Sequence, residues 1–226
     1  MLGDGRSRTR GTAPVIVKVC GVRTPEIAEA AIDAGADWIG LMFVRASPRW
    51  VDDERAVSLM RAVRNRVDLI GVFVEPAIAM CDEAASRYRL SAVQVHGRLD
   101  PTLVAGCSVP VIPVINVESR AAACTIDVAP DVMVMLDGLP DKGHLPGGTG
   151  HHVPIDWAAD VARHRRVLLA GGLGADDVAA AVAAVRPEGV DASSRLERRP
   201  GEKDPELVRA FVRAARSAAA ALERVA

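Results

Sequence analysis

The sequence predicts a (β/α)8 barrel, a single α/β domain over residues 14–226. Short apolar runs of the length that buried parallel strands show alternate with alanine-rich helical stretches. This alternation repeats about eight times along the chain. A chain of 226 residues, half of them hydrophobic, can bury one substantial core and is close in size to such barrels. An open doubly wound sheet is the alternative topology for the same alternation.

Eight apolar runs are the expected strands. They lie at residues 15–20, 38–44, 67–74, 92–96, 109–116, 131–137, 166–170 and 189–193. Strands that alternate with helices pair in parallel through right-handed crossovers, so a helix is expected after each run. The expected helical segments are 25–34, 56–63, 78–88, 102–105, 157–164, 178–185 and 206–225, and the stretch after Ser119 has the least helix signal.

Helix start signals precede most of these segments. The clearest is Thr24-Pro25-Glu26, an N-cap residue with proline at the first helical position, and Gly35 is the corresponding stop signal. Acidic residues, in two cases followed by proline, stand before five of the others at Asp52-Asp53, Asp100-Pro101, Asp156, Asp176-Asp177 and Asp204-Pro205, and Pro76 stands before the segment 78–88.

Composition restricts the class of partner. The 28 basic and 29 acidic residues leave a net charge of −1, which argues against a general nucleic-acid or membrane surface and favours a small-molecule partner. Residues 1–13 are polar and lack an apolar core, so they are expected to form a flexible tail rather than a signal peptide. No apolar run reaches the roughly 18 residues of a membrane-spanning helix.

The four cysteines show no paired spacing. Cys20, Cys81, Cys107 and Cys124 contain no Cys-x-x-Cys motif, so neither a disulfide framework nor a zinc site is expected. Reduced thiols of this kind favour a cytoplasmic location.

Two reactive side chains stand at the ends of predicted strands. Cys20 closes the first apolar run and is followed by Gly21, and Asp137 closes the sixth. Active sites of (β/α)8 barrels lie at the carboxyl ends of the strands, so a thiol and a carboxylate placed there suggest an acid/base pair. The alternatives are a buried cysteine that packs as a hydrophobe and an aspartate that caps the next turn.

Further strand ends supply candidate binding residues: Arg49, Gln94, His96, Gly171, Gly172, Asp191, Ser193 and Ser194. Small residues after the seventh and eighth strands let backbone N–H groups approach a phosphate, which is where barrel enzymes commonly hold one. Gly171-Gly172 alone is equally consistent with an ordinary tight turn.

The blocks that follow one another along the chain resemble the phosphoribosylanthranilate isomerases of tryptophan biosynthesis, from Val15 to about Ala215. The matching segments are 18–21, 34–37, 39–40, 47–49, 71–74, 93–97, 136–137, 147–150, 156–157, 170–173, 189–191 and 201–205. Each block is weakly specific, but their order and spacing together are highly specific. The resemblance implies a cofactor-free Amadori rearrangement, with no metal, that converts an aminoaldose phosphate into an aminoketose phosphate.

The resemblance also implies roles for the two reactive residues. Asp137 would be the general acid that protonates the ring oxygen, which requires a pKa raised by burial or by nearby negative charge. Cys20 would be the general base, which requires a pKa lowered by positive surroundings. Lys18, two residues earlier on the same strand face, is either a contributor to that lowering or a structural ion-pair partner inside the barrel.

Binding roles are implied in the same way. Arg49 matches the arginine that meets the anthranilate carboxylate, a task suited to a planar guanidinium. Gly171, Gly172, Ser193 and Ser194 match the phosphate-binding loops. Gln94 and His96 match a block near the pocket, although a packed, hydrogen-bonded histidine is an equal interpretation. His151-His152 make an unpersuasive metal pair.

Three departures from the family pattern concern the substrate. Arg195 replaces the usual glycine and would either clamp the phosphate or occupy its space. Val111–Val114 lacks a basic residue, and the stretch 151–154 is longer than usual. The leading hypothesis is therefore a phosphoribosylanthranilate isomerase, as a monomer or homodimer. The alternatives are a diverged homologue that acts on a related aminoaldose phosphate in secondary metabolism and a non-catalytic barrel that binds a phosphorylated ligand.

Overall fold

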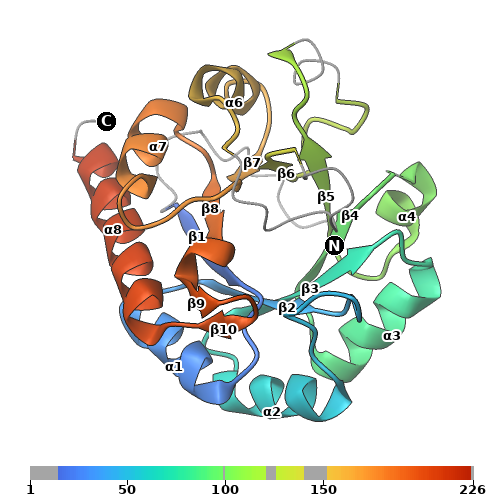
Figure 1. Ribbon diagram of the computed structural model, residues 1–226. Helices are drawn as coiled ribbons and strands as arrows, with labels where there is room; N and C mark the ends of the chain where they lie inside the picture. Colours follow the sequence, from blue (N-terminus) through green and yellow to red (C-terminus); the bar gives the residue numbers. More distant parts are fainter. Residues whose placement is uncertain (1–14, 99, 121–125, 140–151, 225–226) are drawn as a thin grey trace, which may run out of the picture.

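The computed structural model describes residues 15–98, 100–120, 126–139 and 152–224. Within these ranges eight parallel strands pair in chain order and the eighth returns to the first, so the sheet closes into a barrel. The helices surround it (Figure 1). The predicted (β/α)8 barrel is confirmed, and the open sheet is wrong. The expected tail 1–13, most of the stretch after Ser119, the block 147–150 and His151 lie outside the described residues.

Each of the eight predicted runs contains one strand. These are β1 Ile16–Cys20, β2 Trp38–Met42, β3 Asp68–Val74, β4 Ala92–His96, β5 Val111–Asn116, β6 Val134–Asp137, β7 Val167–Leu169 and β8 Gly189–Ala192. β4 has the bounds of its predicted run. The other strands are shorter than the apolar runs, because only part of each run pairs with both neighbours. The apolar residues just outside the ladders are still buried, as Val15, Met133 and Ala170 show.

Most of the helices begin close to the acidic and proline signals, but the helix expected at 157–164 begins at Ile155, one residue before its signal Asp156. They are α1 Pro25–Ala34, α2 Asp53–Val63, α3 Ile78–Tyr88, α4 Pro101–Gly106, α6 Ile155–Ala162, α7 Val178–Val185 and α8 Pro205–Glu223. The side chains of Asp52, Asp100 and Asp204 accept hydrogen bonds from backbone N–H groups in the first turns of α2, α4 and α8. Thr24 occupies the N-cap of α1 but makes no such bond, so Pro25 is the effective start signal there.

Alternate strand residues fill the inside of the barrel. An apolar cluster of Ile70, Ala92, Ile112, Val114, Met133, Met135, Leu168 and Ala170 is separate from the larger core between strands and helices. Because side chains along a strand alternate between two faces, the residues that share the inward face two positions after Val114 and Met135 are Asn116 and Asp137. The interior is therefore apolar toward the amino ends of the strands and polar at their carboxyl ends.

The connection from β8 to α8 forms a small hairpin that the sequence analysis did not predict. A single 3-10 turn, η1 (Ser194–Leu196), leads into β9 (Glu197–Arg199) and the antiparallel β10 (Glu202–Lys203). Gly201 in its turn has a φ of 81°, and a Cβ there would lie 2.2 Å from the carbonyl oxygen of Pro48. Only glycine fits this close approach, which presses the hairpin onto the connection after β2.

Candidate active site

Cys20 and Asp137 lie at the carboxyl ends of β1 and β6, as predicted, and both are buried. The pKa values of both respond to the same two charged side chains, Lys18 and Asp191. The thiol and the carboxyl group therefore share one electrostatic environment at the mouth of the barrel. Gly40 on the neighbouring strand leaves room for the thiol, because a Cβ there would lie 2.8 Å from Cys20 Sγ.

Lys18 is held inside the barrel by polar partners. Its Nζ donates to Asp191 Oδ1 and to Gln94 Oε1, each at 2.8 Å. Burial alone would lower the pKa of Lys18, but Asp191 and Cys20 together raise it above its usual value. Lys18 is thus an ion-pair partner inside the barrel, and its charge also lowers the pKa of the Cys20 thiol, so both effects considered for it are present.

Gln94 and His96 continue this network along β4. The Gln94 amide nitrogen lies 2.9 Å from His96 Nε2. Burial, followed by the charge of Lys18, lowers the pKa of His96 to about 4, so the ring is neutral at pH 7. An amide N–H donates to Nε2, so the ring proton is on Nδ1, a buried atom that has no hydrogen-bond partner among the described residues. His96 is therefore a packed, hydrogen-bonded histidine with one unused donor.

The pKa of Asp137 is raised from 3.8 to about 6. Burial is the main cause and the negative charge of Asp191 is the second, whereas Gly138 N, which donates to Oδ1 at 2.9 Å, and Lys18 act in the opposite direction. The direction is the one that the sequence analysis required of a general acid.

Cys20 differs from the expectation for a general base. Burial raises the pKa of its thiol, and Asp191 adds to the rise. Lys18 and Lys203 lower the pKa, as expected of positive neighbours, but they do not overcome burial. Cys20 is accordingly a thiol at neutral pH, and only a minor fraction is thiolate.

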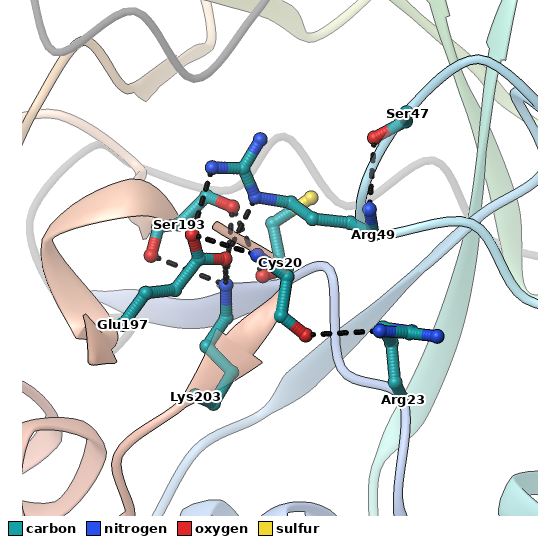
Figure 2. Close-up of polar contacts among 8 residues, drawn as sticks. Cys20, Arg23, Ser47, Arg49, Ser193, Glu197 and Lys203 are labelled. Carbon is teal, nitrogen blue, oxygen red and sulfur yellow. Dashed lines mark hydrogen bonds and ion pairs between the residues drawn. The ribbon is translucent and has the colours of Figure 1, made fainter. Parts of the chain in front are cut away.

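Arg49 lies against the hairpin between β8 and α8 (Figure 2). Its Nε and Nη2 donate to Glu197 Oε1 and Oε2 at 2.7 and 2.9 Å. Its stem crosses Gly21, where a Cβ would lie 2.7 Å from Arg49 Cδ and where φ is +72°. Glu197 was not predicted as a partner of Arg49. The one sequence signal beside it is Pro200-Gly201, a dipeptide typical of tight turns.

The loops after β7 and β8 lie side by side because those strands are paired. Gly171 and Gly172 have φ values of 88° and 69°, so the tight turn requires glycine at both positions. Ser193 Oγ donates to the backbone oxygen of Cys20 at 3.2 Å and accepts from Lys203 Nζ at 3.3 Å. Ser194 begins η1 beside it.

Arg195 takes a geometry that the sequence analysis did not consider. Its guanidinium donates to Asp176 at 2.6 Å and to Asp177 at 2.8 Å, at the start of α7. The Arg195 hydrogen bond is also the main cause of the lowered pKa of Asp176. The arginine is thus paired with carboxylates beside the loops after β7 and β8.

His152 gives no sign of a metal centre. Its side chain is exposed, and Nε2 lies 3.9 Å from Asp177 Oδ2. Across the described ranges, no three His, Cys, Asp or Glu residues are grouped so that they could hold a metal ion. Helices in the described part of the chain are also too short or too polar to cross a membrane.

The fold and the site together define a barrel enzyme with a carboxylic acid and a thiol at the carboxyl ends of two of its strands, on the same side of the barrel as turns suited to an anion. Comparison with known proteins specifies the family. The model of the N-(5'-phosphoribosyl)anthranilate (PRA) isomerase family matches residues 17–214. The chain belongs to this family.

Relatives and solved structures agree. An N-(5'-phosphoribosyl)anthranilate isomerase of Pelobacter propionicus is 39% identical over 200 residues, which cover 88% of this chain and 95% of the relative. The dimeric phosphoribosylanthranilate isomerase of Thermotoga maritima, solved as generated monomers, superimposes with a TM-score of 0.79 at 27% identity, covering 90% of this chain and 99% of the other. A phosphoribosyl anthranilate isomerase in complex with reduced 1-(o-carboxyphenylamino)-1-deoxyribulose 5-phosphate gives 0.75 at 28% identity and the same coverage.

Proposed function

We propose that this protein isomerises N-(5-phosphoribosyl)anthranilate to 1-(2-carboxyphenylamino)-1-deoxyribulose 5-phosphate in tryptophan biosynthesis. The observation that carries the proposal is the presence of Cys20 and of Asp137, whose pKa is about 6, at the carboxyl ends of strands in a barrel of this family. Two opposed proton transfers need one acid and one base, and these groups differ in pKa.

In the first step, Asp137 donates its proton to the furanose ring oxygen. The bond between that oxygen and C1′ breaks as the nitrogen lone pair forms a C1′=N double bond. A carboxyl group with a pKa of about 6 retains part of its proton at neutral pH, whereas one with a pKa of 3.8 would not.

In the second step, the Cys20 thiolate takes the proton from C2′. The C2′–H electrons form a C1′=C2′ double bond, and the C=N electrons return to nitrogen. The resulting enol tautomerises to the ketone when its hydroxyl loses a proton and C1′ gains one. The substrate supplies both electron shifts, so the reaction needs no cofactor and no metal.

Binding roles form part of the same proposal. Arg49 would meet the aromatic carboxylate, and Gly171, Gly172, Ser193 and Ser194 would meet the phosphate, with Arg195 next to them. Gln94 and His96 would line the interior below the reacting carbons. The support for a phosphate site is the positive φ of both glycines and the adjacency of the two loops.

The departures that favoured a diverged homologue carry less weight in the folded chain. Arg195 pairs with Asp176 and Asp177. Pro113 lies between Ile112 and Val114, which both face the inner cluster, so position 113 faces away from the interior.

Complementation tests the function directly. The gene should restore growth without tryptophan to a bacterium that lacks this isomerase, and Cys20→Ser should not. Failure of the folded wild-type protein to complement would favour a related aminoaldose phosphate as substrate. Binding of phosphate without turnover of either class would favour a non-catalytic barrel.

We further propose a cytoplasmic location and a monomer or homodimer. Free thiols at Cys20, Cys81 and Cys107 support a reducing compartment. Sedimentation would give the oligomeric state.

A further inference from the structure

Glu197, the first residue of β9, is a buried carboxylate between two cations. Its side chain is 4% exposed. Oε1 accepts from Arg49 Nε at 2.7 Å and from Lys203 Nζ at 2.5 Å, and Oε2 accepts from Arg49 Nη2 at 2.9 Å and from Gly201 N at 3.3 Å. One carboxylate thus joins the connection after β2 to both strands of the hairpin (Figure 2).

The pair with Glu197 fixes the orientation of Arg49. Two parallel hydrogen bonds hold the plane of a guanidinium as well as its position. The stem is confined as well, because it crosses Gly21 and because Arg49 N donates to Ser47 Oγ at 3.1 Å. Nη1 takes no part in the pair with Glu197, so the direction of this remaining edge depends on the carboxylate.

Glu197 also holds Lys203, whose side chain is 1% exposed. Lys203 Nζ donates to Ser193 O and Oγ, at 3.2 and 3.3 Å, and Ser193 Oγ donates to the backbone oxygen of Cys20. The same carboxylate is therefore linked to the anthranilate-binding arginine on one side and to the strand end with the thiol on the other.

The charge of Glu197 matters as much as its shape. Burial lowers the pKa of Lys203, and the positive charge of Arg49 adds to this, while Glu197 opposes both. Without the carboxylate, two buried cations would face each other with no anion between them. Breaking one partner out of such a group is strongly unfavourable. Arg49, whose side chain is 11% exposed, would turn toward solvent, whereas Lys203 is 1% exposed and keeps its two acceptors on Ser193.

We propose that Glu197 is a positioning residue that orients Arg49 toward the aromatic carboxylate of the substrate. The inference rests on the proposed function, in which Arg49 meets that carboxylate. Glu197 does not touch the substrate in this scheme and acts through Arg49.

Two ligands and a matched control variant test it. The ligands are reduced 1-(o-carboxyphenylamino)-1-deoxyribulose 5-phosphate and the same compound without the ring carboxylate. Glu197→Gln should weaken binding of the first by about tenfold to 100-fold and of the second by less than about twofold. The control is Glu188→Gln, which breaks another bidentate pair, with Arg166 at 2.8 and 2.6 Å, at the amino end of β8. It should change neither affinity.

A double-mutant cycle separates positioning from a general structural role. In an Arg49→Ala background, Glu197→Gln should cause little further loss of affinity for the carboxylated ligand, because the residue through which it acts is gone. KM should rise more than kcat falls. Glu197→Asp keeps the charge and should bind the carboxylated ligand more tightly than Glu197→Gln does.

Three results would overturn the inference: equal weakening of the binding of both ligands, additive losses of affinity in the double-mutant cycle, or unchanged affinities in Glu197→Gln. If the wild-type enzyme still turns over the substrate, the proposed function stands in each of these cases. Absence of wild-type turnover would overturn the proposed function instead. If Glu197→Gln does not fold, the ratio of the two affinities is measured in Glu197→Asp, whose shorter side chain cannot keep both hydrogen bonds to Arg49 in place. This variant should still lose affinity for the carboxylated ligand relative to wild type, and an unchanged ratio of affinities would overturn the inference.

Discussion

The two ends of the barrel differ in how far their ionisable side chains are buried. At the carboxyl ends of the strands, Asp137 and Cys20 are buried and burial raises both pKa values. At the amino ends, the pair of Arg166 with Glu188 is largely exposed, with side-chain exposures of 49% and 31%. The same strands supply both ends. The difference indicates that the carboxyl ends of the strands hold buried ionisable groups at a cost in stability. At the amino ends, the charged groups remain in contact with solvent.

The largest expected effect on activity comes from removing the acid or the base at the carboxyl ends of the strands. Cys20→Ser and Asp137→Asn should each reduce kcat by about 10²–10⁴-fold, because a positioned proton-transfer group is lost. Binding of the reduced product analogue should stay within a few-fold of wild type. Steady-state kinetics and calorimetry measure the two effects. An enzyme of near wild-type rate with either substitution would refute the assigned roles.

The pH dependence of kcat/KM should report the buried end of the barrel. Below about pH 6, Asp137 is protonated and the thiolate fraction of Cys20 rises tenfold per pH unit, so kcat/KM should rise with it. Above about pH 6, loss of protonated Asp137 offsets the gain of thiolate, and a plateau should extend to the raised pKa of Cys20. A first bend near pH 4 would mean that Asp137 is not perturbed.

Stability should show the cost of burying Asp137. Its folded-state pKa of about 6 lies above the usual 3.8, so its contribution is complete below about pH 4 and is lost as pH rises through 6. The loss corresponds to about 3 kcal/mol. Asp137→Asn should therefore be more stable than wild type at pH 8 by up to about 3 kcal/mol and nearly equal to it at pH 4. Urea unfolding at both values measures this, and a variant less stable at pH 8 would contradict it.

Arg195 is an exception to this difference between the two ends, because its ion pairs lie at the catalytic end but are exposed. Arg195→Gly should weaken binding of inorganic phosphate by a few-fold. Without the arginine, the negative charges of Asp176 and Asp177 would be uncompensated beside the loops after β7 and β8 and would repel the phosphate. Phosphate titration measures the effect. In an Asp176→Asn, Asp177→Asn background the same substitution should have no effect. A persistent loss there would mean that Arg195 clamps the phosphate directly.

The smallest effect belongs to the amino end. Glu188→Gln should leave kcat and KM unchanged and lower stability by no more than about 1 kcal/mol, the usual range for an exposed ion pair. Thermal unfolding and kinetics on one preparation check both. A loss of activity would show that the two ends are coupled.

Much of this protein was determined by short-range sequence information. Alternating apolar runs and capped helices depend on neighbours a few positions away, so the barrel and most of its helix starts could be predicted. Cys20 and Asp137 could be located for the same reason, because each closes an apolar run whose end becomes a strand end. The helix start at Thr24 was right in position, although its side chain does not form the cap hydrogen bond.

The partners of the charged groups were decided by the tertiary structure alone. Arg49 meets Glu197 across 148 positions of sequence, and Lys18 meets Asp191 across 173. Neither of the two roles predicted for Arg195 from the sequence involved Asp176. Arginine can pair with any carboxylate of suitable geometry, so its identity does not specify a partner. Only closure of the barrel, and the hairpin pressed against Pro48 through Gly201, brings each cation to its carboxylate.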